Sequence, residues 1–314
     1  KEAETTEEKI RCLEEMLRVI PKHKGTDHLQ GDLRRRLSKL RDQSKRDAVR
    51  TRKGFSHKVR KEGAGQVALA GMPNAGKSAI IDVLTNAEPV VAAYPFTTRV
   101  PQAAMMPYKD IKVQLVDMPP VSDEHEEHWV VDLLKAADVN CLVLDMSTDP
   151  LKQLEFIMDH LRKKRLWPKE AESLPEDKRP VAAVFRPMIV ACTKVDDREV
   201  EEVFELFCEL CETDLPLFAV SAQTGRGMER LRQALFDILD VIRVYSKTPG
   251  RKPDLEEPFV LPAGSTMYDF AVSVHRELAE QLKFARIWSE NKYDGQMVNR
   301  DEPLRDGDIL ELHH

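Results

Sequence analysis

The stretch Gly71-Met-Pro-Asn-Ala-Gly-Lys-Ser78 fits the phosphate-binding pattern G-x-x-x-x-G-K-[ST] at every fixed position. A short apolar run at residues 67–70 precedes it, and residues 79–84 after it have helical character. A strand, a glycine-rich turn and a helix in that order aim backbone N–H groups at an anion on the positive end of the helix. The stretch therefore predicts a site for a nucleoside phosphate.

Two side chains of this stretch have roles of their own. Lys77 is expected to reach the outer phosphates and to act in catalysis, and the Ser78 hydroxyl is expected to bind Mg²⁺. The residues expected to contact the phosphates are Gly71, Pro73, Asn74, Ala75, Gly76, Lys77, Ser78 and Ala79.

Three later apolar runs indicate the metal and the base. Residues 112–117 end in Asp117, which suits a water-mediated contact to Mg²⁺, and residues 189–192 lead into Thr193-Lys194-Val195-Asp196. The Asp196 carboxylate can accept both the N1–H and the N2–H of guanine, a pair of donors that adenine lacks, while the Lys194 stem can lie along the base. A third run ends at Ser221, where a backbone amide can meet guanine O6. The expected base-binding residues are Thr193, Lys194, Asp196, Ser221 and Ala222.

A loop between the first two elements reads Tyr94-Pro-Phe-Thr-Thr98. A threonine here is expected to bind Mg²⁺ and the γ-phosphate from a mobile loop. Thr98 is the first candidate for this catalytic and metal-binding role, and Thr97 is the alternative. Four such elements in the right order, each at the end of an apolar run, favour GTP as the nucleotide.

Together these elements resemble the Obg-related GTPases, and within them the branch called developmentally regulated GTP-binding proteins. The resemblance covers nearly the whole chain. The segment from Phe259-Val-Leu-Pro-Ala-Gly-Ser-Thr to Arg305-Asp-Gly-Asp-Ile-Leu-Glu-Leu looks like a TGS domain, a small β-grasp module similar to ubiquitin. The resemblance implies a GTPase that is associated with ribosomes, translation or RNA.

The chain is expected to have four parts. Alternating apolar runs and helical runs favour a three-layer α/β P-loop GTPase domain with a mostly parallel sheet. Helical runs are expected at 129–136, 151–162, 200–211, 228–245 and 267–282, and residues 164–186 are read as a surface excursion. The expected parts are a basic helical region at 1–63, the GTPase domain at 64–247, a linker at 248–257 and the β-grasp TGS domain at 258–314.

The net charge of −6 is unevenly distributed along the chain. Residues 1–63 hold 19 Lys and Arg against 11 Asp and Glu, a net charge of +8, so the remainder carries −14. Apolar residues at helical spacing predict a helical hairpin with a basic polar face. We weigh two roles for it: attraction to RNA phosphate, above all ribosomal RNA, and a solvated or docking arm that meets the acidic remainder of the chain.

Composition indicates a cytoplasmic protein without membrane contact. No apolar run approaches the ~18 residues of a membrane span, and the first residues lack a signal-peptide pattern. Of the five cysteines, Cys141 and Cys192 lie in apolar runs and are read as core residues. Cys208 and Cys211 form a single C-x-x-C, so zinc is not expected. The sequence does not indicate an oligomeric state.

The chain departs from its relatives in the loop after Asp117. Relatives carry D-x-x-G, whose glycine amide binds the γ-phosphate, but Pro120 stands here and has no N–H. We expect weakened γ-phosphate sensing, unless a neighbouring amide or water replaces the glycine. Val121 takes the place of a water-orienting glutamine, and Obg-type enzymes are also hydrophobic here, which implies slow hydrolysis. His125 and His128 are weighed as water-orienting groups against a solvated helix start.

Asn74 introduces a further alternative. Relatives with asparagine at this place sometimes use it to bind K⁺ beside the phosphates, and an amide oxygen suits that ion. The other interpretation is that Asn74 only shapes the turn.

These features predict a GTP- and GDP-binding regulatory switch with slow hydrolysis, acting on a ribosomal or RNA assembly. A second hypothesis is a nucleotide-gated adaptor with little or no hydrolysis, which Pro120 favours. A third, ATP hydrolysis as in some Obg relatives, is disfavoured by Lys194 and Asp196.

Overall fold

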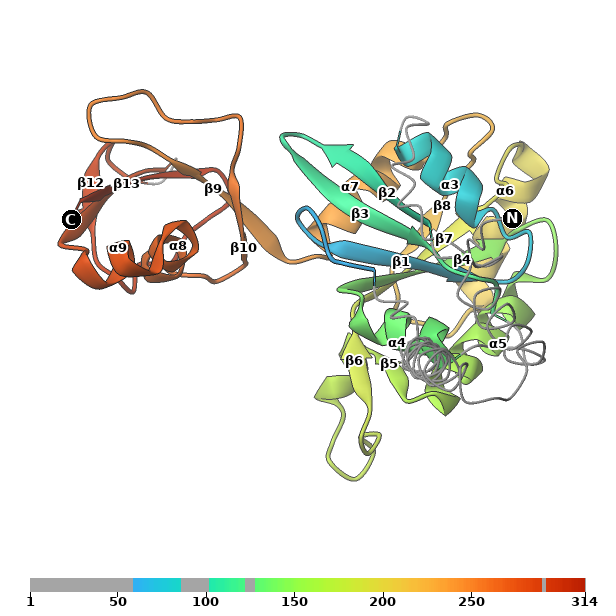
Figure 1. Ribbon diagram of the computed structural model, residues 1–314. Coiled ribbons are helices and arrows are strands. Elements are labelled where there is room, and N and C mark those ends of the chain that lie inside the picture. Colours follow the sequence, from blue (N-terminus) through green and yellow to red (C-terminus); the bar gives the residue numbers. More distant parts are fainter. Residues whose placement is uncertain (1–58, 86–101, 122–127, 290–291, 314) are drawn as a thin grey trace, which may run out of the picture. The chain divides into compact units, whose positions relative to one another are not determined.

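The computed structural model describes residues 59–85, 102–121, 128–289 and 292–313 (Figure 1). Several predictions lie outside these residues and stay predictions: the helical hairpin of the N-terminal region, Thr97, Thr98 and His125.

The first domain is built on a six-stranded sheet in the order β2-β3-β1-β4-β7-β8. Its strands are parallel except β2, which pairs antiparallel with β3. The strands are β1 Gln66–Gly71, β2 Gln102–Tyr108, β3 Ile111–Asp117, β4 Val139–Asp145, β7 Met188–Thr193 and β8 Leu217–Ala219. Every residue of β1, β4 and β7 is buried, as expected for parallel strands covered on both faces. The predicted three-layer α/β fold is confirmed.

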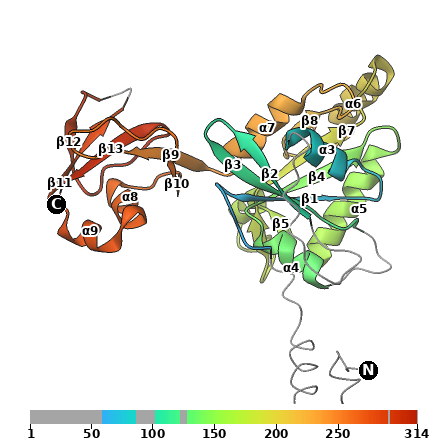
Figure 2. The same ribbon diagram turned by 45° about the horizontal axis from the view of Figure 1, so that its top comes forward.

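Helices cover both faces of this sheet (Figures 1 and 2). One face packs against α3 Lys77–Leu84 and α7 Met228–Asp237 through Ile80, Leu84 and Leu231. The other face packs against α4 His128–Ala136, α5 Pro150–Lys163 and α6 Arg198–Leu210 through Leu134, Ile157 and Phe207. None of the helices in the described residues combines the length and the apolar character that crossing a membrane requires.

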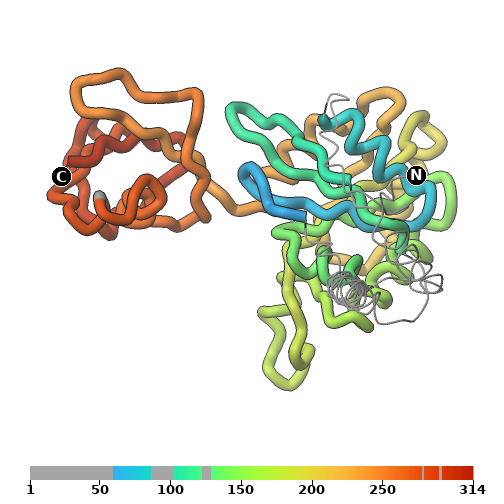
Figure 3. Tube along the Cα trace, in the orientation of Figure 1, coloured from blue at the N-terminus to red at the C-terminus, as the bar shows by residue number. Residues whose placement is uncertain are grey.

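Residues 164–186 form the predicted excursion between α5 and β7 (Figure 3). Two short parallel strands, β5 Leu166–Pro168 and β6 Val184–Arg186, pair at its base, and the 3₁₀ helix η1 Lys169–Ser173 follows β5.

The C-terminal domain has a five-stranded sheet in the order β10-β9-β13-β11-β12. Two helices, α8 Met267–Val274 and α9 Arg276–Gln281, contribute Phe270 and Ala279 to its core. The strands are β9 Val241–Ser246, β10 Phe259–Pro262, β11 Phe284–Trp288, β12 Gln296–Val298 and β13 Asp308–His313. Thr266 and Asp269 form the predicted capping pair at the start of α8.

Two predicted helices and one predicted boundary were wrong. The helix expected at 228–245 ends at Asp237, and residues 241–246 form β9, which pairs with both β10 and β13. Ile242 and Val244 stand two residues apart and share the face that enters the C-terminal core, and the strand pairing overrides the helical reading. The expected linker at 248–257 is therefore a loop inside the C-terminal sheet, which begins at β9. The helix expected at 267–282 is interrupted at His275, whose backbone is extended.

A buried arginine joins the two domains at the tip of the β2–β3 hairpin. Arg243 in β9 is 8% exposed and donates to Asp110 in that tip (2.6 Å) and to Asp306 (2.8 and 3.0 Å). The Tyr245 hydroxyl donates to the other oxygen of Asp110. Because each charge is partnered, burying this group does not leave an unpaired ion.

Candidate nucleotide-binding site

The loop between β1 and α3 curls around the start of the helix. Gly76 occupies the N-cap of α3 with φ 93°, and Asn74 also has a positive φ of 59°. No side chain of the described residues caps α3, and its first turn contains no acidic residue. Position 71 requires glycine, because a Cβ there would lie only 2.5 Å from the Val143 carbonyl oxygen. The helix therefore starts with open N–H donors, which suit an anion.

Lys77 is held across this loop. Its side chain is 8% exposed, and its Nζ donates to the carbonyl oxygens of Gly71 (3.1 Å) and Met72 (3.0 Å). Burial lowers the pKa of Lys77, and the nearby Asp117 carboxylate opposes that shift. A phosphate bound here would favour the charged ammonium form of Lys77. The position of the lysine across the loop therefore suits contact with an anion.

Ser78 and Asp117 meet beside the lysine. The Ser78 Oγ donates to Asp117 Oδ2 at 2.5 Å. Burial raises the pKa of Asp117, while the Ser78 hydrogen bond and the Lys77 charge act in the opposite direction. Hydroxyl and carboxylate oxygen atoms are the hard ligands that Mg²⁺ takes, so this pair fits the ion.

A cavity of about 460 Å³ contains these groups. Gln102 at the start of β2 and Met118 after β3 also line it, and the sequence reasoning named neither. Both residues reach the cavity because the sheet topology places the start of β2 and the end of β3 beside the phosphate loop. The lining residues are Pro73, Asn74, Lys77, Ser78, Gln102, Asp117, Met118, Pro119 and Pro120.

Thr193, at the end of β7, ties the predicted base-binding loop to the phosphate loop. Its hydroxyl lies 2.7 Å from the Ala75 carbonyl oxygen and 3.0 Å from that of Leu144. Gly76 also lies against Thr193, since a Cβ on Gly76 would be 3.5 Å from the threonine hydroxyl. A threonine that is 4% exposed and bonded in this way fixes the distance between the two loops.

The other predicted base-binding side chains are also partnered. Lys194, at a positive φ of 61°, forms an ion pair with Asp145 at the end of β4. The Ser221 hydroxyl donates to Asp196, and the Thr224 amide donates to Ser221 Oγ at 2.9 Å. Ser221 is fully buried, and Ala222 follows it in the turn. The structure thus brings Asp196 and Ser221 together.

Asp145 is a site residue that the sequence reasoning missed. Burial alone would raise the pKa of Asp145, but hydrogen bonds from Lys194 and Ser147 hold it below its usual range. Its position at the carboxyl end of a central strand is the signal that marks such residues.

The loop after Asp117 turns inward at Val121. Val121 is 1% exposed and lies in the same core cluster as Met118. Its backbone N–H donates to the Gly71 carbonyl oxygen at 3.0 Å. Pro120 is exposed and lines the cavity. The amide next to Pro120 is therefore already used by the phosphate loop, and the Val121 side chain points into the core.

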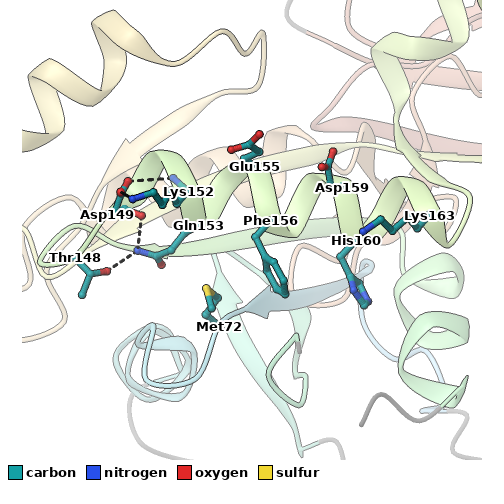
Figure 4. Close-up of a pocket in the computed structure, with 10 residues that line it drawn as sticks. All are labelled: Met72, Thr148, Asp149, Lys152, Gln153, Glu155, Phe156, Asp159, His160 and Lys163. Atoms are coloured by element: carbon teal, nitrogen blue, oxygen red, sulfur yellow. Dashed lines mark hydrogen bonds and ion pairs between the residues drawn. The ribbon is translucent and has the colours of Figure 1, made fainter. Parts of the chain in front are cut away.

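A second cavity, of about 570 Å³, lies along α5 (Figure 4). Phe156 and His160 project from the side of the helix that faces Met72, whereas Glu155 and Asp159 project away from it. This cavity is larger than the one at Lys77, yet none of the predicted site residues lines it. Its walls come from α5, from Thr148 and Asp149 just before it, and from Met72, and they do not include the phosphate-loop residues 73–78. We therefore take the smaller cavity as the candidate nucleotide site.

Comparisons with known proteins agree with this geometry. Residues 66–174 match the family described as 50S ribosome-binding GTPase, and residues 242–314 match the TGS domain. The chain is 28% identical to an uncharacterized GTP-binding protein of Methanocaldococcus jannaschii (98% of this chain, 92% of the relative). It is 26% identical to developmentally-regulated G-protein 1 of Arabidopsis thaliana (97% and 90%). Both alignments are longer than this chain, so these relatives carry segments that it lacks.

The fold also has a relative of known structure. The YchF GTPase of Schizosaccharomyces pombe superposes with a TM-score of 0.55 at 13% identity. The match covers 82% of this chain and 100% of that chain. This likeness shows the arrangement of the elements and nothing about specificity.

Proposed function

We propose that this chain, which is a P-loop GTPase with a C-terminal TGS domain, is a slow GTP-hydrolysing switch that acts on ribosomes or another RNA assembly. Guanine-nucleotide binding follows from the family. The slow rate, the switch role, the cytoplasmic location and the partner are the proposal.

The arrangement of Lys77, Ser78 and Asp117 in one cavity is the observation that carries the proposal. Lys77 would contact the outer phosphates and lower the barrier to hydrolysis by stabilising negative charge that develops on them. Ser78 and Asp117, together with Thr98 from outside the described residues, would hold Mg²⁺. When bound, that ion neutralises charge on the β- and γ-phosphates.

Base recognition rests on Asp196 and its support. In this proposal the carboxylate accepts two hydrogen bonds from guanine. The Ser221 hydroxyl donates to the same carboxylate and orients it. Lys194 covers the base, with its charge held by Asp145. The backbone around Ser221 and Ala222 supplies a donor to O6. Phosphate contacts come from Gly71, Pro73, Asn74, Ala75, Gly76 and Ala79 in addition to Lys77 and Ser78.

Slow hydrolysis is inferred from what the chain places near the γ-phosphate. Val121 is buried and cannot orient a water molecule. His128 is the first residue of α4, and its side chain lies outside what the structure describes, so its weighed role in orienting water stays a prediction. Hydrolysis therefore relies on the phosphate loop, Mg²⁺ and solvent water, which accelerates the reaction less than an oriented water does.

A nucleotide-held adaptor is the second candidate, and Val121 is the observation that favours it. Its N–H is the nearest substitute for the amide missing at Pro120, but it donates to Gly71. An adaptor of this kind would hydrolyse little GTP, even in the presence of ribosomes.

The proposed link to ribosomes rests on the description of the matching family and on the TGS domain. The basic region at 1–63 adds a surface that suits RNA phosphate. Asn74, exposed at the mouth of the cavity, is offered as a K⁺ ligand.

A single-turnover assay with purified ribosomes tests the proposal. We expect slow GTP hydrolysis alone, faster hydrolysis with ribosomes, and no hydrolysis by Lys77→Ala in either condition. An unchanged, near-zero rate with ribosomes would replace the switch by the adaptor. Equal turnover in K⁺ and Na⁺ buffers would remove the role of Asn74 in K⁺ binding.

A further inference from the structure

Helix α6 has one apolar face that the fold uses. Phe207 is 2% exposed, and Val200 and Phe204 pack partly buried against the same core cluster. The residues of this face follow the helical repeat of a buried stripe, and their packing holds α6 on the sheet.

A second apolar row lies on the exposed side of α6 and has no such role. Val203, Leu206 and Leu210 are 39%, 54% and 56% exposed. Their spacing of three and four residues places them on one side of the helix. A single exposed leucine is ordinary on a protein surface, but three large apolar side chains in register mark an interaction surface. We call these three residues the α6 apolar row.

Carboxylates lie along one side of the α6 apolar row. The only basic residue of the helix, Arg198, lies 3.5 Å from Glu202, and Glu201 is paired with Arg226 outside the helix. Glu199 and Glu209 are exposed and form no ion pair with any residue that the structure describes. Glu199 lies four residues before Val203 and Glu209 three residues after Leu206, so helical spacing places both beside the row. The surface is therefore apolar in the middle and acidic at its edge.

We propose that the α6 apolar row docks a basic amphipathic helix of a partner protein. An apolar stripe on the partner would cover Val203, Leu206 and Leu210, as when an amphipathic helix binds an apolar surface. Lysine or arginine side chains beside that stripe would meet Glu199 and Glu209. This inference does not depend on the nucleotide chemistry, because none of these residues lines the cavity at Lys77.

The charge of α6 argues against the other occupants. Nucleic acid and anionic lipid both carry negative charge, which the carboxylates repel. A second copy of this chain meeting the row with its own α6 would place like charges against each other. A basic helix is the occupant that satisfies both the apolar row and its acidic edge.

Fluorescence anisotropy with a labelled peptide tests this proposal on the full chain. The probe is a peptide of about 18 residues with leucine at helical spacing i, i+3, i+4 and i+7 and lysine elsewhere. We expect saturable binding, weakened at least tenfold by Leu206→Ala with Leu210→Ala. Glu199→Gln with Glu209→Gln is expected to weaken binding severalfold and to reduce its salt dependence.

Matched controls separate docking from general attraction. A peptide of the same composition without the helical spacing should bind at least tenfold more weakly, and Leu255→Ala, at an exposed leucine elsewhere (54%), should change binding less than twofold. GDP affinity measures whether each variant is folded.

Several outcomes overturn the proposal. They are absence of peptide binding, equal binding of the rearranged peptide, or binding that Leu206→Ala with Leu210→Ala leaves unchanged. A dimer in light scattering that those substitutions dissociate would assign the row to a second copy. RNA binding that they abolish would assign it to nucleic acid.

Discussion

The base end and the γ-phosphate end of the proposed nucleotide site differ in how many internal contacts support them. At the base end, the Thr193 hydroxyl lies within hydrogen-bond distance of two carbonyl oxygens that share its one hydrogen, and the Ser221 hydroxyl donates to Asp196. At the γ-phosphate end, Pro120 offers no N–H, and the Val121 amide bonds Gly71. The difference teaches that holding a guanine nucleotide and sensing its third phosphate are separable properties. We propose that this chain holds the nucleotide mainly through its base end and senses the γ-phosphate weakly.

Asp196→Asn removes the main predicted contact to guanine at the base end, and its expected effect is the largest. The variant replaces an acceptor of two charge-assisted hydrogen bonds, each of which contributes about 1.5–3 kcal/mol, by a group that accepts one. We expect GDP affinity to fall ~100-fold or more in equilibrium binding. Xanthosine diphosphate should then bind better than GDP, because its C2 oxygen can accept from the new amide.

Asp177→Asn, an exposed position in the excursion, is the matched control and should leave GDP affinity unchanged. Asp196→Asn with unaltered GDP affinity would remove Asp196 from base recognition.

Thr193→Val tests the tie between the two loops with nearly constant side-chain shape. It leaves the Ala75 and Leu144 carbonyl oxygens without their hydroxyl donor. A buried acceptor left unpaired costs about 1–3 kcal/mol. We expect about tenfold weaker binding of GDP and of a GTP analogue alike, measured by calorimetry. Thr248→Val, at an exposed threonine, serves as control. A change confined to one nucleotide would contradict the proposed tie.

Pro120→Gly tests the γ-phosphate end of the proposed site. It restores an N–H where the relatives have one, and a hydrogen bond to a charged phosphate is worth about 1.5 kcal/mol or more. We expect the affinity for a non-hydrolysable GTP analogue to rise about tenfold relative to GDP. Pro119→Gly should not produce this change. If both variants behave like the parent protein, the loop geometry and not the missing N–H sets the nucleotide preference.

Asp117→Asn separates stability from metal binding. Burial raises the pKa of Asp117, so in the nucleotide-free protein the ionised carboxylate opposes folding. This loss of stability develops as pH rises from the ordinary pKa of 3.8 through the raised folded value. We expect the variant to melt at a higher temperature than the parent at pH 7 without nucleotide. The difference should shrink as pH falls toward 3.8.

The same variant should lose most of the stabilisation that Mg²⁺ with GDP gives the parent protein. Asp214→Asn, at an exposed aspartate, is the control. A variant that melts below the parent at pH 7 would contradict the inferred direction.

The GTPase half of the fold was predictable because its signals are local. The phosphate-loop pattern, the apolar runs and their acidic ends each lie within a few residues of one another. Strand β9 was missed because its residues, read alone, continue the helical spacing of α7. Its pairing with β10 and β13 involves residues up to 64 positions away, such as Asp308 opposite Val244, which a local pattern does not contain.

Sequence patterns could name residues for the candidate site but not the contacts that those residues make. Sequence patterns named Thr193 and Asp196 for base recognition, a role that stays a prediction. They did not indicate that Thr193 bonds Ala75, that Asp145 pairs with Lys194, or that the Val121 amide is used by Gly71. Each of these contacts joins strands brought side by side by the sheet order. Their existence depends on the three-dimensional register.

Equilibrium binding of GDP and of a non-hydrolysable GTP analogue to nucleotide-free protein with Mg²⁺ tests the central claim most directly. The claim is that the base end holds the nucleotide while the γ-phosphate contributes little. It predicts affinities for the two nucleotides that agree within about threefold, with an ATP analogue bound far more weakly. A GTP analogue bound at least tenfold more tightly than GDP would contradict it and would show that the γ-phosphate is sensed despite Pro120.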